Sequence, residues 1–275
     1  MSQEKRFLQR LAGGWIYIVW IYLSVAWRFC GWRLSLWFHR TPESNHTGMK
    51  QTLLFIRHGQ TTWNVEHRLP GQLPGIDLND TGRQQAARLS DALMVLPISA
   101  IISSPLERAR ETAEIIAQPR NLPVQIEPRL MDIDVGHWTG QDHDKINKED
   151  PAWKAFVKDP TVAPPDVETF PQVQQRALEA VEYWRAEGNI GAYPAFVTHA
   201  DVIKLLIAHY TGLEAGKAGR LSIDNASVSL VELEPESRPR VIAIGWNPQP
   251  GWLKPPTPEA EQSKGEAQVA SEQKE

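Results

Sequence analysis

The sequence contains one cysteine and no excess of positive charge, and each of these features excludes certain kinds of site or partner. A lone Cys30 can form neither an internal disulfide nor a cysteine-based zinc site. The formal net charge of −4 provides no basic surface for nucleic acid, so we expect no nucleic-acid partner. His143 and His209 have no partner at metal-ligand spacing, and we expect neither a metal nor another cofactor.

The composition is otherwise ordinary for a globular protein, but the charge is unevenly distributed. Hydrophobic residues make up 41% and charged residues 23% of the 275 positions, enough for one substantial core or two small ones. Six cations and two carboxylates give residues 1–48 a net charge of +4, which leaves −8 on the remainder. An acidic body that nevertheless gathers arginines at one place points to a bound anion.

Residues 1–48 differ from the rest of the chain. They hold five of the eleven tryptophans, and residues 11–27 run without a charge, close to the shortest length that spans a bilayer. Three interpretations are open: a membrane anchor, a translation start assigned upstream of Met49, or a peripheral amphipathic segment. On the first, residues 11–27 would tie a cytoplasmic domain to a membrane.

We expect the domain to span residues 49–252 and to be followed by a disordered tail over 253–275, which is rich in proline and charge. Within the domain, apolar runs and helical periodicity alternate along the chain. The expected strands are 52–57, 100–103, 124–126, 195–198, 228–232 and 241–244, and the expected helices are 81–93, 106–117, 144–148, 152–158, 171–187 and 202–210.

This alternation predicts an α/β fold with a largely parallel sheet covered by helices on both faces. The last two strands are joined by the turn at 235–239, which indicates an antiparallel edge. The expected architecture is therefore a three-layer sandwich with a mostly parallel sheet.

The most informative segment begins with a buried strand at 53–56 and continues as Arg57-His58-Gly59. A strand ending this way places a cation and a nucleophilic imidazole at the carboxyl edge of the sheet, where open α/β proteins bind ligands. Glycine allows a sharp turn and a close approach of the backbone to a ligand.

Two further segments place cations just after short strands. Ser103–Ala113 contains Arg108, and Phe196–Asp201 contains His199. Parallel strands end at one edge, so these cations should lie close together. Their convergence is hard to explain without an anion to bind.

Together with the segment Leu130–Gly140, these motifs resemble the histidine phosphatase superfamily, which includes cofactor-dependent phosphoglycerate mutases. The resemblance extends from about residue 52 to 246 and implies the phosphoglycerate mutase-like fold. It implies that His58 is the nucleophile that takes up the phosphoryl group.

The same resemblance assigns the surroundings of the phosphate. Arg57, Asn64, Arg108 and His199 would form the phosphate pocket, with His199 also counted among the catalytic residues. Guanidinium groups suit this task because they present paired donors and keep their charge.

Asp132 occupies the position where the family usually has a glutamate as the proton donor to the leaving group. Its side chain is one methylene shorter, which reduces its reach by roughly 1.5 Å. Asp134 and His137 are the alternative candidates for the acid.

The expected function is a metal-independent phosphomonoesterase of the histidine acid phosphatase type, acting on a small phosphorylated metabolite through a phosphohistidine. The alternatives are phosphoglycerate mutase-type phosphoryl transfer and a phosphate-binding protein with little turnover. The sequence leaves the physiological substrate and the oligomeric state open.

Overall fold

The computed structural model describes residues 49–186 and 190–249. The interpretations of residues 1–48 and of the tail at 253–275 therefore concern residues outside the described part. Among the described residues, no helix is long and apolar enough to cross a membrane.

Six strands form one sheet in the order β3-β2-β4-β1-β5-β6. They are β1 (Gln51–Arg57), β2 (Ala100–Ser103), β3 (Val124–Ile126), β4 (Pro194–Thr198), β5 (Val228–Leu233) and β6 (Arg240–Trp246). The first four run parallel, whereas β5 is antiparallel to β1 and β6 is antiparallel to β5. The predicted fold, a mostly parallel sheet with an antiparallel edge, is confirmed.

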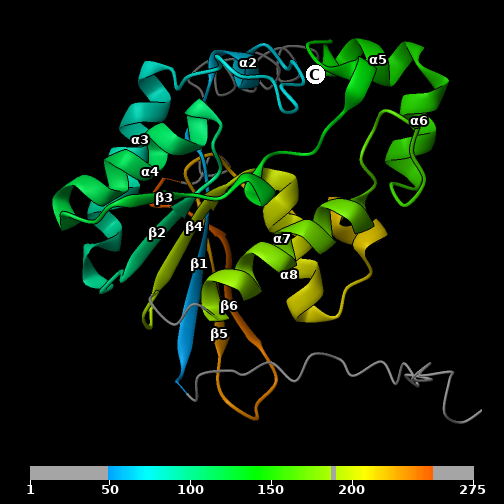
Figure 1. The fold of residues 1–275 in the computed structure, drawn as a ribbon. Coiled ribbons are helices and arrows are strands. Elements are labelled where there is room, and N and C mark those ends of the chain that lie inside the picture. Colours follow the sequence, from blue (N-terminus) through cyan, green and yellow to red (C-terminus); the bar gives the residue numbers. More distant parts are fainter. Residues whose placement is uncertain (1–48, 187–189, 250–275) are drawn as a thin grey trace, which may run out of the picture. The chain divides into compact units, whose positions relative to one another are not determined.

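Helices lie on both faces of this sheet, α3 and α4 on one and α7 and α8 on the other (Figure 1). The α-helices are α2 (Thr62–Val65), α3 (Asp80–Ala92), α4 (Glu107–Ala117), α5 (His143–Glu149), α6 (Pro151–Lys158), α7 (Phe170–Ala186) and α8 (Ala200–Thr211). The 3-10 helices are η1 (Leu93–Val95), η2 (Gln118–Arg120), η3 (Pro128–Leu130), η4 (Gly136–Trp138) and η5 (Ala215–Arg220).

Strand β1 is apolar on both faces because it separates two hydrophobic cores. Leu53 and Phe55 belong to the core beneath α7 and α8, while Leu54 and Ile56 belong to the core beneath α3 and α4. All four side chains are fully buried. This double burial fixes the register of β1 and with it the position of the residues that follow it.

The six predicted helices each begin one or two residues away from their expected starts. Helix α3 begins one residue earlier than expected, with Asn79 as its N-cap, because the Asn79 side chain accepts a hydrogen bond from the amide of Gly82 (2.8 Å). Helix α4 begins at Glu107 after an extended Leu106, so Pro105 precedes its first turn. The four-residue helix α2 was not predicted.

Gly59 is required for a different reason from the one that the sequence suggested. A Cβ at Gly59 would lie 2.5 Å from the carbonyl oxygen of Gly82, in the first turn of α3. The two glycines let the backbone after β1 pass directly against α3. Close backbone packing, rather than approach to a ligand, therefore explains the glycine at this position.

Candidate active site

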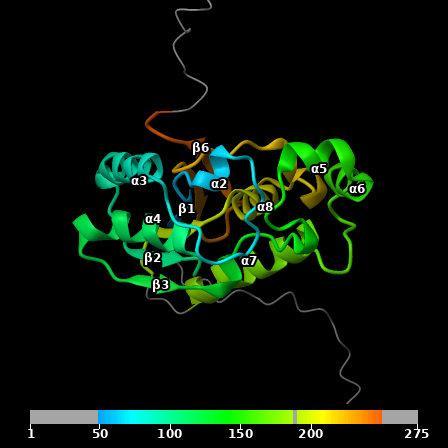
Figure 2. The ribbon, with the colours of Figure 1, turned by 90° about the horizontal axis from the view of Figure 1, so that it is seen from above.

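The carboxyl ends of β1 and β4 bring the two predicted histidines together. Parallel pairing places Arg57 opposite Thr198, so His58 and His199 follow side by side, with ring centroids 5.2 Å apart. Figure 2 looks down on the described domain from above, where α2 and the strand ends lie. Arg108 reaches the same place from the first turn of α4.

His58 is 2% exposed, and its Nδ1 lies 2.7 Å from the carbonyl oxygen of Gly59. A carbonyl only accepts, so Nδ1 carries the hydrogen and the lone pair is on Nε2. Burial, together with the charges of Arg108 and Arg57, lowers the pKa of His58 well below 6.5. The site thus presents a neutral imidazole, the form that can act as a nucleophile.

The cations around His58 carry more hydrogen-bond donors than the neighbouring residues satisfy. The Nη1 of Arg57 donates to the carbonyl of Ile223 (2.7 Å), and the Nη2 of Arg108 donates to that of Gly71 (2.9 Å). Other buried side-chain nitrogens of this cluster have no hydrogen-bond partner among the described residues: Arg57 Nε, Arg108 Nε, Arg108 Nη1 and His199 Nδ1. Buried polar groups are normally paired, so their concentration here fits a bound oxyanion.

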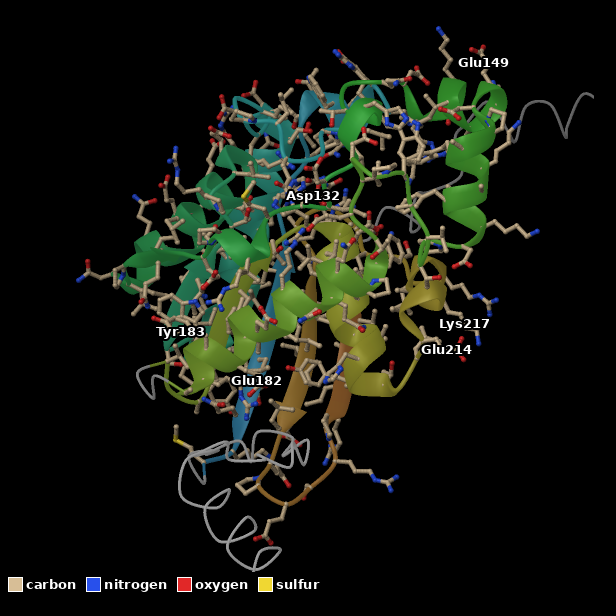
Figure 3. All side chains as sticks on the ribbon, turned by 45° about the vertical axis from the view of Figure 1, so that its right-hand side comes forward. Asp132, Glu149, Glu182, Tyr183, Glu214 and Lys217 are labelled. Carbon is tan, nitrogen blue, oxygen red and sulfur yellow. The ribbon has the colours of Figure 1, made fainter. Side chains whose placement is uncertain are left out.

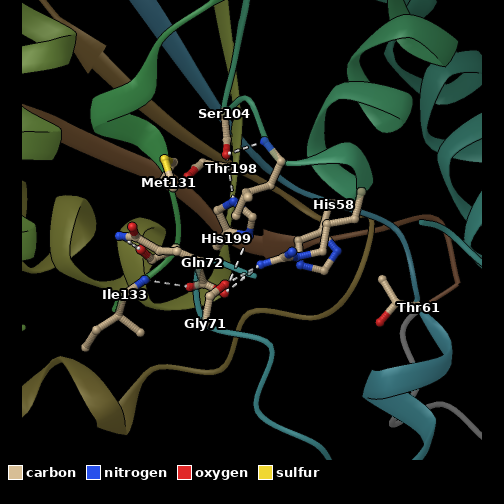
Figure 4. Close-up of polar contacts among 12 residues, drawn as sticks. His58, Thr61, Gly71, Gln72, Ser104, Met131, Ile133, Thr198 and His199 are labelled. Carbon is tan, nitrogen blue, oxygen red and sulfur yellow. Dashed lines mark hydrogen bonds and ion pairs between the residues drawn. The ribbon is translucent and has the colours of Figure 1, made fainter. Parts of the chain in front are cut away.

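His199 is fully buried and directly precedes α8. Its Nε2 lies 2.9 Å from the Oγ of Ser104, as Figure 4 shows, and its Nδ1 lies 3.6 Å from the Oδ2 of Asp132. Burial and the charge of Arg108 lower the pKa of His199 well below 6.5. A bound phosphate dianion would oppose both effects and favour the charged imidazolium. The amino end of α8 would in turn favour the dianion.

Asp132 reaches this pocket despite its short side chain. Its Oδ2 lies 3.3 Å from the Nη2 of Arg108. Burial raises the pKa of Asp132 above 3.8, and the charge of Arg108 opposes that rise. In Figure 3 Asp132 lies near the middle of the view, whereas Glu149 and Lys217 lie toward its edge.

The two alternative acids are committed elsewhere. The Oδ1 of Asp134 accepts a hydrogen bond from the amide of Gly136 (2.9 Å). The Nδ1 of His137 lies 2.8 Å from the Oδ2 of Asp166 at the surface. A cavity opens beside His58, and Asp132 is among the residues that line it, whereas Asp134 and His137 are not. Asp132 is therefore the candidate that the structure places with the histidines.

Asn64 also lines the cavity, and its side chain is fixed by its neighbours. Its Oδ1 accepts hydrogen bonds from the amide of Thr61 (3.0 Å) and from the Nδ2 of Asn225 (3.2 Å). Asn225 also donates to the carbonyls of His58 and Gly59. The sequence did not reveal this role, since Asn225 lies far along the chain in a loop without a recognisable motif.

Thr112 is a second residue whose role the sequence did not reveal, although it lies in the segment that carries Arg108. Its Oγ1 accepts a hydrogen bond from the amide of Gly59 (3.0 Å) and donates one to the carbonyl of Arg108 (2.7 Å). This single hydroxyl joins the loop after β1 to α4. It thereby fixes the distance between the two cationic elements of the pocket.

The cavity above these groups has a volume of about 570 Å³. One wall carries Arg68, whose guanidinium carbon lies 4.1 Å from the ring centre of Trp63. Another wall is formed by the largely buried Trp153 and Phe156. This size falls in the range of pockets that hold small organic ligands, so the space exceeds what a phosphate group alone requires.

No group of three or more His, Cys, Asp or Glu side chains within the described ranges could hold a metal ion. The positive charge near His58 comes instead from arginine side chains. Arginines can stabilise the charge that develops on a transferring phosphoryl group.

Comparison with known proteins bears directly on this arrangement. Residues 53–246 match the profile of the histidine phosphatase superfamily (branch 1). A relative from Shigella boydii, named probable phosphoglycerate mutase GpmB, is 33% identical over 193 residues, which cover 70% of this chain and 87% of the relative.

Solved structures of similar proteins agree in fold. Bacillus stearothermophilus YhfR is 36% identical with a TM-score of 0.65, and the match covers 71% of this chain and 96% of YhfR. A mycobacterial glucosyl-3-phosphoglycerate phosphatase is 30% identical with a TM-score of 0.63, and the match covers 72% of this chain and all of that protein. The matched region contains every residue of the pocket, from Arg57 to Asn225, and on these grounds the chain belongs to the histidine phosphatase superfamily.

Proposed function

We propose that this protein is a metal-independent phosphomonoesterase that works through a phosphohistidine at His58. The observation that carries the proposal is the set of buried, unpartnered nitrogens of Arg57, Arg108 and His199 near a neutral imidazole. Asp132 adds a buried carboxyl group with a raised pKa beside them. A phosphate monoester supplies what this set lacks, a dianion with a leaving oxygen that needs a proton.

In the first half-reaction the Nε2 of His58 attacks phosphorus, and the bond to the ester oxygen breaks. Arg57 and Arg108 stabilise the charge on the non-bridging oxygens. Asp132, protonated, gives its proton to the departing oxygen, so the product is a neutral alcohol. The phosphoryl group then remains on His58 as a covalent intermediate.

In the second half-reaction Asp132 is a carboxylate and acts as the base. It takes a proton from water, the water oxygen attacks phosphorus, and the bond to the His58 nitrogen breaks. Inorganic phosphate leaves, and both His58 and Asp132 return to their starting forms. One carboxyl group therefore serves both steps.

The cavity favours a small phosphorylated metabolite as the substrate, with the phosphate on the cationic floor and the organic part against the aromatic walls. Mutase activity is the second candidate, because the relatives from Shigella boydii and Escherichia coli are named probable phosphoglycerate mutases. Several solved relatives are named as phosphatases, among them the mycobacterial glucosyl-3-phosphoglycerate phosphatase, and these favour hydrolysis. Incubation with 3-phosphoglycerate separates the two: a phosphatase releases inorganic phosphate, whereas a mutase forms 2-phosphoglycerate.

The central test is His58→Ala, which we expect to abolish p-nitrophenyl phosphate hydrolysis while the protein stays folded. Rapid quenching of the wild-type protein with labelled substrate should trap an acid-labile phosphoenzyme that the variant does not form. His209→Ala, an exposed histidine on α8, is the matched control and should retain full activity. Turnover in the presence of a chelator would support the proposal. Full activity of the His58→Ala variant would refute it.

A further inference from the structure

Arg176, on α7, holds the backbone of the segment that carries Asp132. Its Nη1 donates to the carbonyls of Arg129 and Met131 (2.7 Å each), and its Nη2 donates to the carbonyl of Asp132 itself (2.8 Å). Three carbonyls within four residues thus converge on one guanidinium. These three hydrogen bonds fix the main chain of the segment relative to α7.

Glu168, which lies just before α7, pairs with Arg176, and these two side chains are called the clamp below. Its two oxygens each lie 2.8 Å from Arg176, Oε1 from Nε and Oε2 from Nη2, in the bidentate geometry that makes such pairs strong. The same Oε2 accepts a hydrogen bond from the amide of Asp134 (2.8 Å). The side chains of Arg176 and Glu168 are 17% and 24% exposed, so solvent screens the pair only in part.

Gln72 connects the clamp to the other side of the pocket. Its Nε2 donates to the carbonyl of Asp132 (2.9 Å), a contact drawn in Figure 4. The preceding residue, Gly71, accepts the hydrogen bond from Arg108. The carbonyl of Asp132 is therefore held from two directions, by α7 and by the loop that also positions a phosphate-binding arginine.

We propose that the Arg176–Glu168 pair is a positioning device that holds the Asp132 backbone close enough to the pocket for a short aspartate to act as the proton donor. This inference rests on the proposed function, because it assigns Asp132 the role of the acid. With the backbone held, Oδ1 accepts the amide of Ile133 (3.0 Å), and Oδ2 lies near Arg108 and His199. The missing methylene is compensated by the position of the main chain.

A purely structural role for Arg176 makes a different prediction. If the pair only stabilises the fold, its loss should lower turnover of all substrates alike. If it positions the acid, its loss should lower kcat/KM, which reports the first half-reaction, only for substrates whose leaving group needs a proton. A good leaving group such as p-nitrophenolate departs without one, whereas an alkoxide does not.

The test is Arg176→Met, which removes every donor and keeps an unbranched, though shorter, side chain. We expect kcat/KM for an alkyl phosphate to fall roughly 10–100-fold, as for a catalytic group displaced by about 1 Å. The value for p-nitrophenyl phosphate should stay within about threefold. Circular dichroism and thermal unfolding of the full chain establish that the variant is folded.

Arg120→Met is the matched control. Arg120 also donates to two carbonyls, those of Ile116 and Ser90, but it lies past the far end of α4, roughly 18 Å from Arg108 at 1.5 Å per residue. This variant should lose stability without changing the ratio of the two kcat/KM values. A selective loss in Arg120→Met would show that instability alone produces the effect and would overturn the proposal.

A double-mutant cycle with Asp132→Asn separates the clamp from the acid assignment. If Asp132→Asn alone spares alkyl phosphates, the assignment of the acid fails, and the proposed function needs revision. If it is selective and Arg176→Met is not, the acid stands and the clamp is refuted. When both are selective, adding Arg176→Met to Asp132→Asn should produce no further selective loss, because the two act on one step.

Discussion

Arg108→Met should lower activity without lowering stability, because Arg108 is a fully buried cation whose Nε and Nη1 have no partner in the described structure. Those two donors are available to the phosphoryl group, and a hydrogen bond from a charged group contributes about 1.5–3 kcal/mol. Their loss predicts a fall in kcat/KM of about 10²–10⁴-fold.

The effect on folding has the opposite sign. Methionine gives up the bond to the Gly71 carbonyl, which costs about 1 kcal/mol, but it also removes an ion whose burial costs several kcal/mol. Asp132 then loses the nearby charge of Arg108, which raises its pKa further and favours its uncharged form. We expect the unfolding temperature without ligand to be unchanged or higher, by about 2–4 °C for each kcal/mol gained.

Thermal unfolding with inorganic phosphate measures both effects together. At a concentration of 100 Kd, phosphate should stabilise the wild type by about 2.7 kcal/mol. A hundredfold loss of affinity would reduce that gain to about 0.4 kcal/mol in Arg108→Met. A large drop in ligand-free stability, or an undiminished response to phosphate, would refute the assignment of Arg108 as a phosphate-binding cation.

Two further predictions follow from the pKa shifts and from close packing. Burial raises the pKa of Asp132, and the first step needs its protonated form. The value of kcat/KM for an alkyl phosphate should therefore decline as the pH rises through that pKa. The same decline with p-nitrophenyl phosphate would argue against the acid role. Gly59→Ala should destabilise the fold by about 1–3 kcal/mol in thermal unfolding, since its Cβ would meet the Gly82 carbonyl, whereas Gly219→Ala, with nothing within 4 Å of its Cβ, should be neutral.

The sequence predicted the strands and the residues at their ends because both signals are local. The apolar run of β1 and the cations that follow it occupy consecutive positions, and parallel pairing then brings separate strand ends to one edge. Helix boundaries were less accurate, as Asn79 shows, because neighbouring Asn and Thr residues compete as caps and packing selects between them. The periodicity also could not reveal the four-residue α2.

The supporting residues of the site could not be predicted because their partners are distant and chemically unspecific. Arg176 bonds to backbone carbonyls, which every residue has, and Asn225 does the same at His58 and Gly59. Nothing in the sequence distinguishes such an arginine on an amphipathic helix from a solvated one. Only the folded positions of η3 and α7 show that Arg176 faces the segment that carries Asp132.

One physical cause, burial, prepares both reacting groups of the pocket. Desolvation disfavours a charge of either sign, so it lowers the pKa of His58 and raises that of Asp132, in each case toward the uncharged form. These are the forms that the first half-reaction requires of a nucleophile and an acid. Arg57 and Arg108 keep their charge in the same surroundings, because guanidinium does not release its proton in proteins. A pocket that combines these two shifts with charged arginines therefore suits the phosphoryl transfer that we propose.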